Sequence, residues 1–192
     1  MQQVAGKSTF LTVPNVLTLL RIALIPVFVG VFYLPYQWSA LACAVIFAVA
    51  GITDWVDGYL ARKMEQSTKL GAFLDPVADK LMVAAALVLL VEAHATALLA
   101  IPAIVIISRE ITVSALREWM AELGKRASVA VSFVGKVKTT VQMIAITGLL
   151  ANEPDMQFWV VWLAYLLLYL ATGLTLWSMM MYLKAAWPDL KE

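Results

Sequence analysis

The chain has 192 residues, of which 62% are hydrophobic and 14% are charged, and its mean hydropathy is +0.85. A soluble domain of this length would carry about a quarter of charged residues, so the composition excludes an ordinary soluble protein. The single cysteine and the single histidine exclude an internal disulfide, a thiolate metal cluster and a site built from several histidines.

Apolar runs of about 20 residues, the length that crosses roughly 30 Å of hydrocarbon, recur along the chain. They predict an all-α polytopic membrane protein with six transmembrane helices, at residues 14–35, 38–63, 70–91, 96–120, 129–151 and 156–185. Residues 1–13 lack the pattern of a cleaved signal peptide and are expected to form a short interfacial segment. Residues 14–192 are then one transmembrane domain, with no room for a separate soluble domain.

Basic residues are unevenly distributed between the connections. The connections near 33–38, 92–96 and 151–156 contain no Lys or Arg, and all 14 basic residues fall on the other side or in the adjoining helix halves. Because cytoplasmic loops carry the excess of Lys and Arg, both termini and the acidic segment at 54–79 are expected in the cytoplasm.

Several single residues have simpler expected roles. Cys43 is expected to be a small core residue, and His94, in a short polar break, to be a solvated loop residue. Gly173 and Ser178 on the last span are small residues that favour a close helix contact, such as a dimer face.

Four aspartates mark the stretch DWVDGYLARKMEQSTKLGAFLDPVAD. Asp54 and Asp57 are three residues apart and Asp75 and Asp79 are four apart, so each pair projects from one side of a helix. Two helices joined by KMEQSTK would bring the four carboxylates together. Anions at this spacing repel one another unless a divalent cation lies between them, and oxygen ligands favour Mg²⁺ or Mn²⁺ over zinc.

Small residues accompany the carboxylates. Gly58, Ala61 and Gly71 would leave space for a ligand close to the backbone, and Arg62 offers a planar fork for phosphate oxygens. Together these features indicate a diphosphate site with a metal ion. The alternative is a structural cluster of ion pairs at the junction of a helix and a loop.

The spacing D-x2-D-G-x2-A-R-x8-G-x3-D-x3-D is matched at every fixed position. This pattern resembles the signature of the CDP-alcohol phosphotransferase family, a long and specific motif. The stretches VPNVLTLLR, SREITVSALREWMAELGKR and SVAVSFVGKVKTTVQM resemble the bacterial branch that uses a glycerol phosphate acceptor. The resemblance covers about residues 14–143 and extends only loosely to the last span.

The resemblance implies a dimeric six-helix enzyme of the bacterial inner membrane, with its active site on the cytoplasmic side. The enzyme would transfer a phosphatidyl group from CDP-diacylglycerol to sn-glycerol 3-phosphate and release CMP; no nucleic-acid partner is implied. Asp54, Asp57 and Asp75 would hold two Mg²⁺ or Mn²⁺ ions, and Asp79 would act mainly as the general base and also as a metal ligand. The residues expected to contact CDP-diacylglycerol within the signature are Asp54, Gly58, Ala61, Arg62 and Gly71.

Polar residues outside the signature extend this hypothesis. Asn15, Thr18 and Arg21 recur on one side of the first span and are expected to meet the head of the lipid substrate, although helix packing explains them equally well. The residues expected to bind the phosphate of glycerol 3-phosphate are Arg109, Arg117 and Lys136. Arg109 is near the middle of its span, where a charge is costly unless it faces a polar cavity. The asymmetric distribution of basic residues is the alternative explanation for all three.

Two other functions fit part of the pattern. Serine, an inositol phosphate or phosphatidylglycerol could be the acceptor instead of glycerol 3-phosphate. A cation-coupled transporter also uses intramembrane acids, but it predicts carboxylates spread through the span or paired half-repeats. The aspartates of this chain gather at one end.

Overall fold

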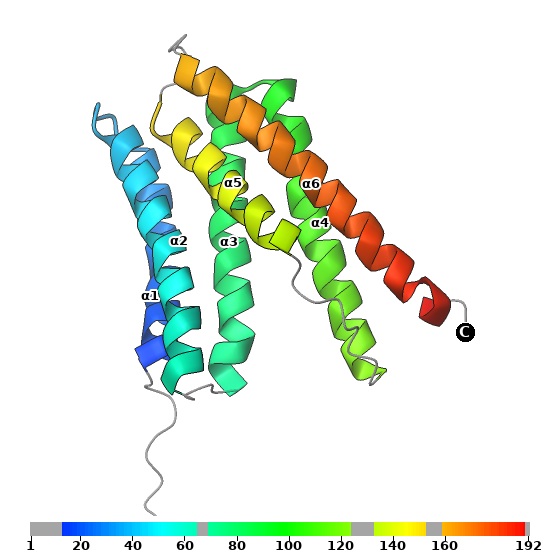
Figure 1. Ribbon diagram of the computed structural model, residues 1–192. Coiled ribbons are helices and arrows are strands. Elements are labelled where there is room, and N and C mark those ends of the chain that lie inside the picture. Colours follow the sequence, from blue (N-terminus) through cyan, green and yellow to red (C-terminus); the bar gives the residue numbers. More distant parts are fainter. Residues whose placement is uncertain (1–12, 65–68, 124–132, 153–158, 191–192) are drawn as a thin grey trace, which may run out of the picture. The chain divides into compact units, whose positions relative to one another are not determined.

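The computed structural model describes residues 13–64, 69–123, 133–152 and 159–190. Within these ranges the chain forms six α-helices and no strand: α1 (Val13–Phe32), α2 (Ser39–Met64), α3 (Lys69–His94), α4 (Ala97–Glu122), α5 (Phe133–Leu150) and α6 (Trp159–Leu190) (Figure 1). Each expected span corresponds to one helix, so the all-α fold is confirmed. Residues 1–12 of the expected interfacial segment lie outside the described residues.

Among the described residues, three helices contain stretches long and apolar enough to cross a membrane: Asn15–Phe32, Ala97–Glu122 and Trp159–Lys184. The apolar parts of α2 and α5 are shorter, at Ser39–Asp54 and Val137–Leu150. The apolar part of α2 stops at Asp54 because the acidic signature begins there. The chain is therefore a membrane protein with three clear spans, and its remaining helices are interrupted by polar residues.

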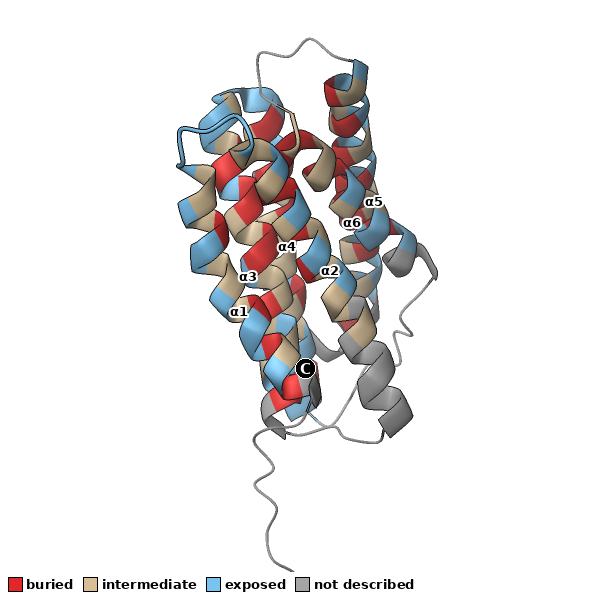
Figure 2. Ribbon diagram, turned by 90° about the vertical axis from the view of Figure 1, so that its left-hand side faces the viewer, coloured by how far each residue is buried: buried red, intermediate tan, exposed pale blue. Residues whose placement is uncertain are grey.

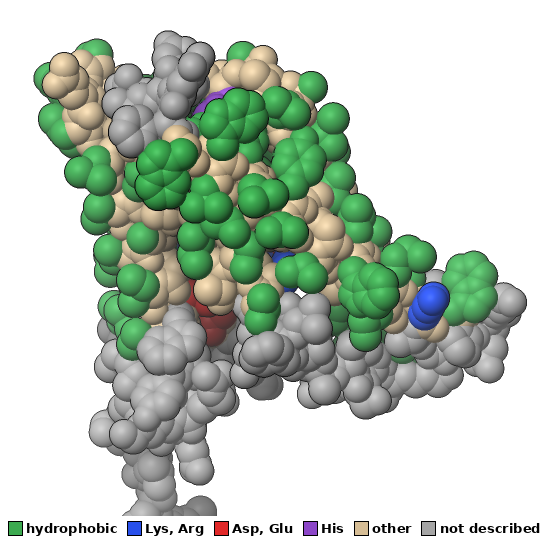
Figure 3. All heavy atoms as spheres, turned by 45° about the horizontal axis from the view of Figure 1, so that its top comes forward, with side chains coloured by type: hydrophobic (Ala, Val, Ile, Leu, Met, Phe, Trp, Pro, Cys, Tyr) green, Lys and Arg blue, Asp and Glu red, His purple; other side chains and the backbone are tan. Residues whose placement is uncertain are grey.

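Only a minority of the residues in the apolar spans are buried. Only 22% of Asn15–Phe32 and 33% of each of the other two spans is buried. Figure 2 shows exposed residues recurring along each helix, and hydrophobic side chains cover much of the face seen in Figure 3. Helices satisfy every backbone N–H and C=O group internally, which hydrocarbon requires. An outward apolar surface on such helices is suited to contact with lipid.

The chain divides into two compact units, Met1–Ala86 and Leu87–Glu192. In the first unit α1 packs against α2, and the ring centroids of Phe28 and Phe47 are 6.5 Å apart. Cys43 is buried there, with its sulfur 3.8 Å from the carbonyl oxygen of Phe28. The expectation that Cys43 is a small core residue is confirmed.

In the second unit α6 packs against both α4 and α5. Leu99, Ile146 and Leu168 are fully or almost fully buried in this core. Gly148 on α5 is close to α6, because a Cβ atom at this position would be 3.3 Å from the Cβ atom of Ala164. A small residue at such a crossing lets two membrane helices approach closely.

Candidate active site

Three of the four signature aspartates have described side chains, and all three belong to the first unit. Asp54 is on α2, whereas Asp75 and Asp79 are on α3. The side chain of Asp54 is 43% exposed, and Asp75 and Asp79 are partly buried. Asp57 follows Asp54 on α2, but its side chain lies outside the described part of the chain. Half-exposed carboxylates remain accessible to an ion or a polar ligand.

The first helix connects the two acidic helices through polar side chains. Thr18 and Arg21 are three residues apart, so they leave the same side of α1. The Thr18 hydroxyl donates a hydrogen bond to Oδ1 of Asp75. Nη1 of Arg21 donates to Oδ1 of Asp54 at 2.5 Å. Carboxylates from α2 and α3 are thus gathered at one stretch of α1.

The polar residues of α1 that were expected to meet the head of the lipid substrate are buried. Asn15, Thr18 and Arg21 are 1%, 0% and 2% exposed, respectively. All three face the protein interior, and at least two of them contact carboxylates of the signature. A guanidinium group buried among apolar helices is costly without an anion, and Asp54 supplies that anion.

The donor atoms of the signature are all oxygens, which suit Mg²⁺ or Mn²⁺. The chemistry of the donor set therefore fits the expected ions. The described side chains contain no group of three or more His, Cys, Asp or Glu residues that could hold one metal ion. The expected set also includes Asp57, so it is only partly contained in the described region.

The small residues of the signature are described only in part. Gly71, near the start of α3, is buried, as expected for a residue that lets a ligand or another helix approach. Gly58, Ala61 and Arg62 lie on the last part of α2, and nothing beyond their helical backbone is described. Their contacts with the nucleotide stay a prediction.

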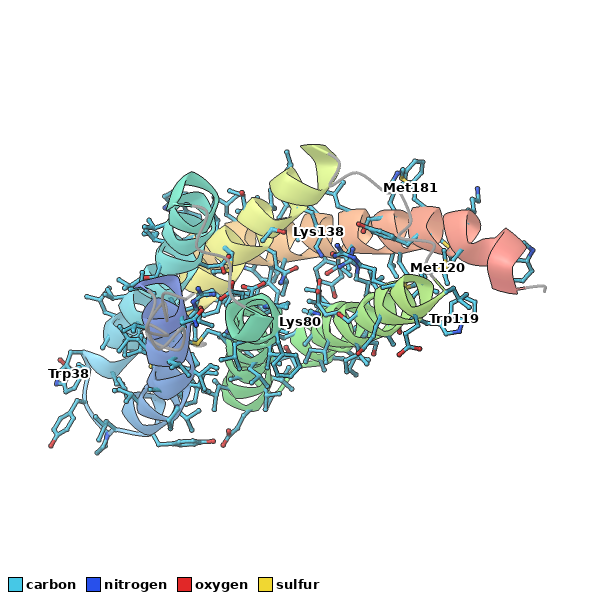
Figure 4. All side chains as sticks on the ribbon, turned by 90° about the horizontal axis from the view of Figure 1, so that it is seen from below. Trp38, Lys80, Trp119, Met120, Lys138 and Met181 are labelled. Carbon is cyan, nitrogen blue, oxygen red and sulfur yellow. The ribbon has the colours of Figure 1, made fainter. Side chains whose placement is uncertain are left out.

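A second polar cluster belongs to the second unit and joins α4, α5 and α6. Oε1 of Glu110 accepts hydrogen bonds from Nη1 of Arg109 at 2.8 Å and from Nζ of Lys138 at 2.9 Å. Figure 4 shows Lys138 projecting from α5. Nη2 of Arg109 donates to Oγ of Ser178 at 3.0 Å, and its guanidinium carbon is 5.9 Å from the centre of the Tyr182 ring. Two cations and one anion leave these side chains with one excess positive charge.

This second cluster is buried, and polar atoms that lack partners occur in it and one helical turn from it. The side chains of Arg109 and Lys138 are 11% and 6% exposed. Within the described region, Nε of Arg109, Oε1 of Gln142 and Oγ1 of Thr175 are buried and form no hydrogen bond. Gln142 is one turn after Lys138 on α5, and Thr175 is one turn before Ser178 on α6. Because unpaired buried polar atoms are costly, these atoms favour a further polar group in this part of the unit.

The basic residues expected to bind phosphate are only partly brought together. Arg109 is in the cluster, near the middle of α4 as predicted. Arg117 is exposed, and the side chain of Lys136 lies outside the described region. Lys138 was not predicted, and neither was Glu110. The signal that could have found them is the presence of both charges inside apolar stretches, where each needs a partner.

Two expectations for single residues were wrong. Ser178 is 8% exposed and contacts Arg109, so it faces the interior of its unit and not a dimer partner. His94 is the last residue of α3 and not a solvated loop residue, because its Nδ1 is 2.8 Å from the hydroxyl oxygen of Tyr165. Burial lowers the pKa of the His94 imidazole below its ordinary value, which favours its neutral form.

Comparison with known proteins agrees with the signature. Residues 11–181 match the model of the CDP-alcohol phosphatidyltransferase family. A CDP-diacylglycerol–glycerol-3-phosphate 3-phosphatidyltransferase of Pseudomonas fluorescens is 59% identical over 182 residues, which cover 94% of this chain and 93% of the relative. Relatives with the same name from Yersinia enterocolitica and Shigella flexneri are 56% and 57% identical, and the matches cover 95% and 94% of this chain and 98% and 97% of the relatives. The acidic signature, the helical fold and these matches agree, and the chain belongs to the CDP-alcohol phosphatidyltransferase family.

Proposed function

We propose that this chain transfers the phosphatidyl group of CDP-diacylglycerol to sn-glycerol 3-phosphate, which gives phosphatidylglycerol phosphate and CMP. The observation that carries the proposal is the complete acidic signature, in a chain that is 56% to 59% identical to relatives named for this reaction. The convergence of Asp54 and Asp75 on α1 supports a functional role for the signature.

The reaction is a displacement at phosphorus. A hydroxyl oxygen of the acceptor attacks the β-phosphorus of CDP-diacylglycerol and forms a new P–O bond. The P–O bond to CMP breaks, and CMP leaves with its electron pair. The attacking hydroxyl must lose its proton, and the carboxylate of Asp79 accepts it as the general base.

Asp54, Asp57 and Asp75 would hold two Mg²⁺ or Mn²⁺ ions, with Asp79 as a further ligand. Bound divalent ions would neutralise charge on the diphosphate and on departing CMP. Gly58, Ala61 and Gly71 would line the slot for the cytidine, Arg62 would meet the diphosphate, and Asn15 would lie at the head of the lipid substrate. The all-oxygen donor set and the repulsion between bare carboxylates at this spacing support the metal assignment.

The acceptor differs from a neutral alcohol by a phosphate that carries nearly two negative charges. Arg109 binds this phosphate together with Lys138, while Arg117 and Lys136 are further basic residues on the same two helices. The buried position of both side chains and the unpaired Nε of Arg109 support this assignment.

The enzyme resides in the bacterial inner membrane as a homodimer, with both termini and the active site on the cytoplasmic side. The absence of Lys and Arg near 33–38, 92–96 and 151–156 supports this orientation. Gly173 is exposed, and a Cβ atom there would have no neighbour within 4 Å. Such a position would permit a close contact with a helix of a second copy.

One experiment tests both the reaction and the acceptor. The purified full-length protein is mixed with CDP-diacylglycerol, Mg²⁺ and one acceptor at a time: sn-glycerol 3-phosphate, serine, an inositol phosphate or phosphatidylglycerol. CMP release and the mass of the lipid product are measured. We expect phosphatidylglycerol phosphate with glycerol 3-phosphate, and no product after chelation until Mg²⁺ or Mn²⁺ is restored.

The outcomes separate the parts of the proposal. A product with only one of the other acceptors would keep the family chemistry and replace the acceptor. Full turnover in the chelated preparation would remove the metal assignment. No CMP release with any acceptor would overturn the proposed activity.

A further inference from the structure

The polar side chains of α1 are engaged with the signature and not with an open surface. Thr18 donates to Asp75 on α3, and Arg21 donates to Asp54 on α2. A residue whose main task is to hold a ligand headgroup presents its polar atoms to the ligand. Thr18 and Arg21 are instead 0% and 2% exposed, while the Asp54 carboxylate in front of Arg21 is 43% exposed. The Asp54 carboxylate is therefore the accessible group, whereas the Arg21 guanidinium is on the buried side of that carboxylate.

Each of these two hydrogen bonds goes to a single oxygen of its own carboxylate. The acceptor atom is Oδ1 in Asp75 and in Asp54. Oδ2 of each carboxylate is therefore the oxygen that would meet an ion. A carboxylate fixed through one oxygen has fewer orientations to lose when its second oxygen binds an ion, so fixation favours binding.

We propose that Thr18 and Arg21 are positioning residues, which hold Asp75 and Asp54 so that their second oxygens are presented to the divalent ion. This inference rests on the metal site of the proposed function and adds residues of α1 that touch neither the ion nor the reacting atoms. Their effect is exerted through the aspartates. The spacing of one helical turn between Thr18 and Arg21 lets one helix orient ligands that come from two others.

The test is a titration of the full-length protein with Mn²⁺ alone, followed by the electron paramagnetic resonance signal of the free ion. Removal of a hydrogen-bond partner of a metal ligand typically weakens metal binding by about 10- to 100-fold. We expect a loss of this size in Thr18→Val, which keeps the shape of the side chain but not its hydroxyl. Thr18→Ser should restore most of the affinity, because it returns the donor. Arg21→Gln should lose affinity as well, with Arg21→Lys less affected.

A matched control is provided by Thr53, next to Asp54 on α2. Its hydroxyl donates to the backbone carbonyl of Val49 at 2.7 Å, within its own helix. Thr53→Val removes a threonine hydroxyl from the same unit without removing a hydrogen bond to an aspartate, so its Mn²⁺ affinity should match that of the unaltered protein. Asp75→Asn serves as the reference for loss of a ligand.

The outcomes distinguish this inference from the proposed function. If Asp75→Asn loses Mn²⁺ while Thr18→Val and Arg21→Gln bind it normally, Thr18 and Arg21 serve helix packing and the inference is overturned, but the metal site stands. If Asp54→Asn and Asp75→Asn both bind Mn²⁺ normally, the metal site itself is wrong. Should Thr18→Val fail to fold, Thr18→Ala and Thr18→Ser give the same comparison. Equal affinities in that pair would overturn the role of Thr18.

Discussion

Among single residues, the signature aspartates differ in their contacts despite their common chemistry. Asp54 and Asp75 are hydrogen-bonded to α1, which suits ligands that must stay fixed. Asp79 is one turn after Asp75 on α3, so its carboxylate is close to a residue that we propose as a metal ligand. A base needs this proximity, because the hydroxyl that it deprotonates must be close to the reacting phosphorus.

Asp79→Asn separates binding from proton transfer. The amide keeps the shape of the carboxylate but cannot accept the proton, so we expect CMP release to fall by about 10²- to 10⁴-fold. Binding of CDP-diacylglycerol should be largely retained, because the proposed ion ligands Asp54, Asp57 and Asp75 are unchanged. The measurements are turnover with both substrates and binding of CDP-diacylglycerol alone. Near-normal turnover would mean that another group takes the proton.

Arg109 and Lys138 allow a test of acceptor recognition. A hydrogen bond from a charged donor contributes about 1.5–3 kcal/mol, so loss of one should weaken acceptor binding by roughly 10- to 100-fold. We expect Arg109→Gln and Lys138→Gln each to raise the KM for glycerol 3-phosphate far more than that for CDP-diacylglycerol. Lys184→Gln is the control, because Lys184 is an exposed residue of α6.

Acceptor affinity that is unchanged in both variants would limit Arg109 and Lys138 to a structural ion pair with Glu110. The KM for the acceptor should be measured at saturating CDP-diacylglycerol, with a melting curve for each variant. A fall in melting temperature without a change in KM would also indicate a purely structural role. The cluster would then hold α4, α5 and α6 together and would not select the substrate.

On the scale of helices, each unit is organised around one element that contacts two others. In the first unit α1 packs against α2 and bonds a carboxylate of α3. In the second, α6 packs against α4 and α5. At Gly148 α5 comes close to α6, because a Cβ atom there would be in tight contact with Ala164. Packing in membrane helices relies on such close approach, because lipid is as apolar as the helices themselves.

Gly148→Leu should therefore destabilise the protein. Its Cβ atom would be 3.3 Å from that of Ala164, and overpacking of this kind costs about 1–3 kcal/mol. Gly30→Leu on α1 is the matched control, because a Cβ atom there would have no neighbour within 4 Å. Both variants gain helix propensity, so their difference in stability reports packing alone. Equal melting temperatures in detergent would show that α5 can shift to accommodate the new side chain.

On the scale of the whole chain, the distribution of basic residues predicts which connections face the cytoplasm. Cysteines introduced one at a time at Ser67 and Thr96 should react with a membrane-impermeant thiol reagent from opposite sides of the membrane. Thr96 is exposed in the connection before α4. The natural Cys43 is buried, and Cys43→Ala provides a background without thiols. Labelling of both positions from the same side would contradict the six-span topology.

The sequence by itself determined the class of the protein, the six helices and the acidic signature. Apolar length and helix breakers are local properties, so the six helices could be located to within about five residues. The signature could be found because its fixed spacings lie within 26 residues of continuous chain, Asp54 to Asp79. Its match to a family then indicated the reaction.

Only the tertiary structure decided which faces of the helices meet. A span that is apolar on all sides has no strong periodicity that distinguishes its buried face from its lipid-facing side. The sequence therefore could not show that Thr18 and Arg21 bond aspartates, that Lys138 and Glu110 join Arg109, or that Ser178 points inward. Those contacts depend on the rotation of each helix about its axis, which packing against other helices fixes.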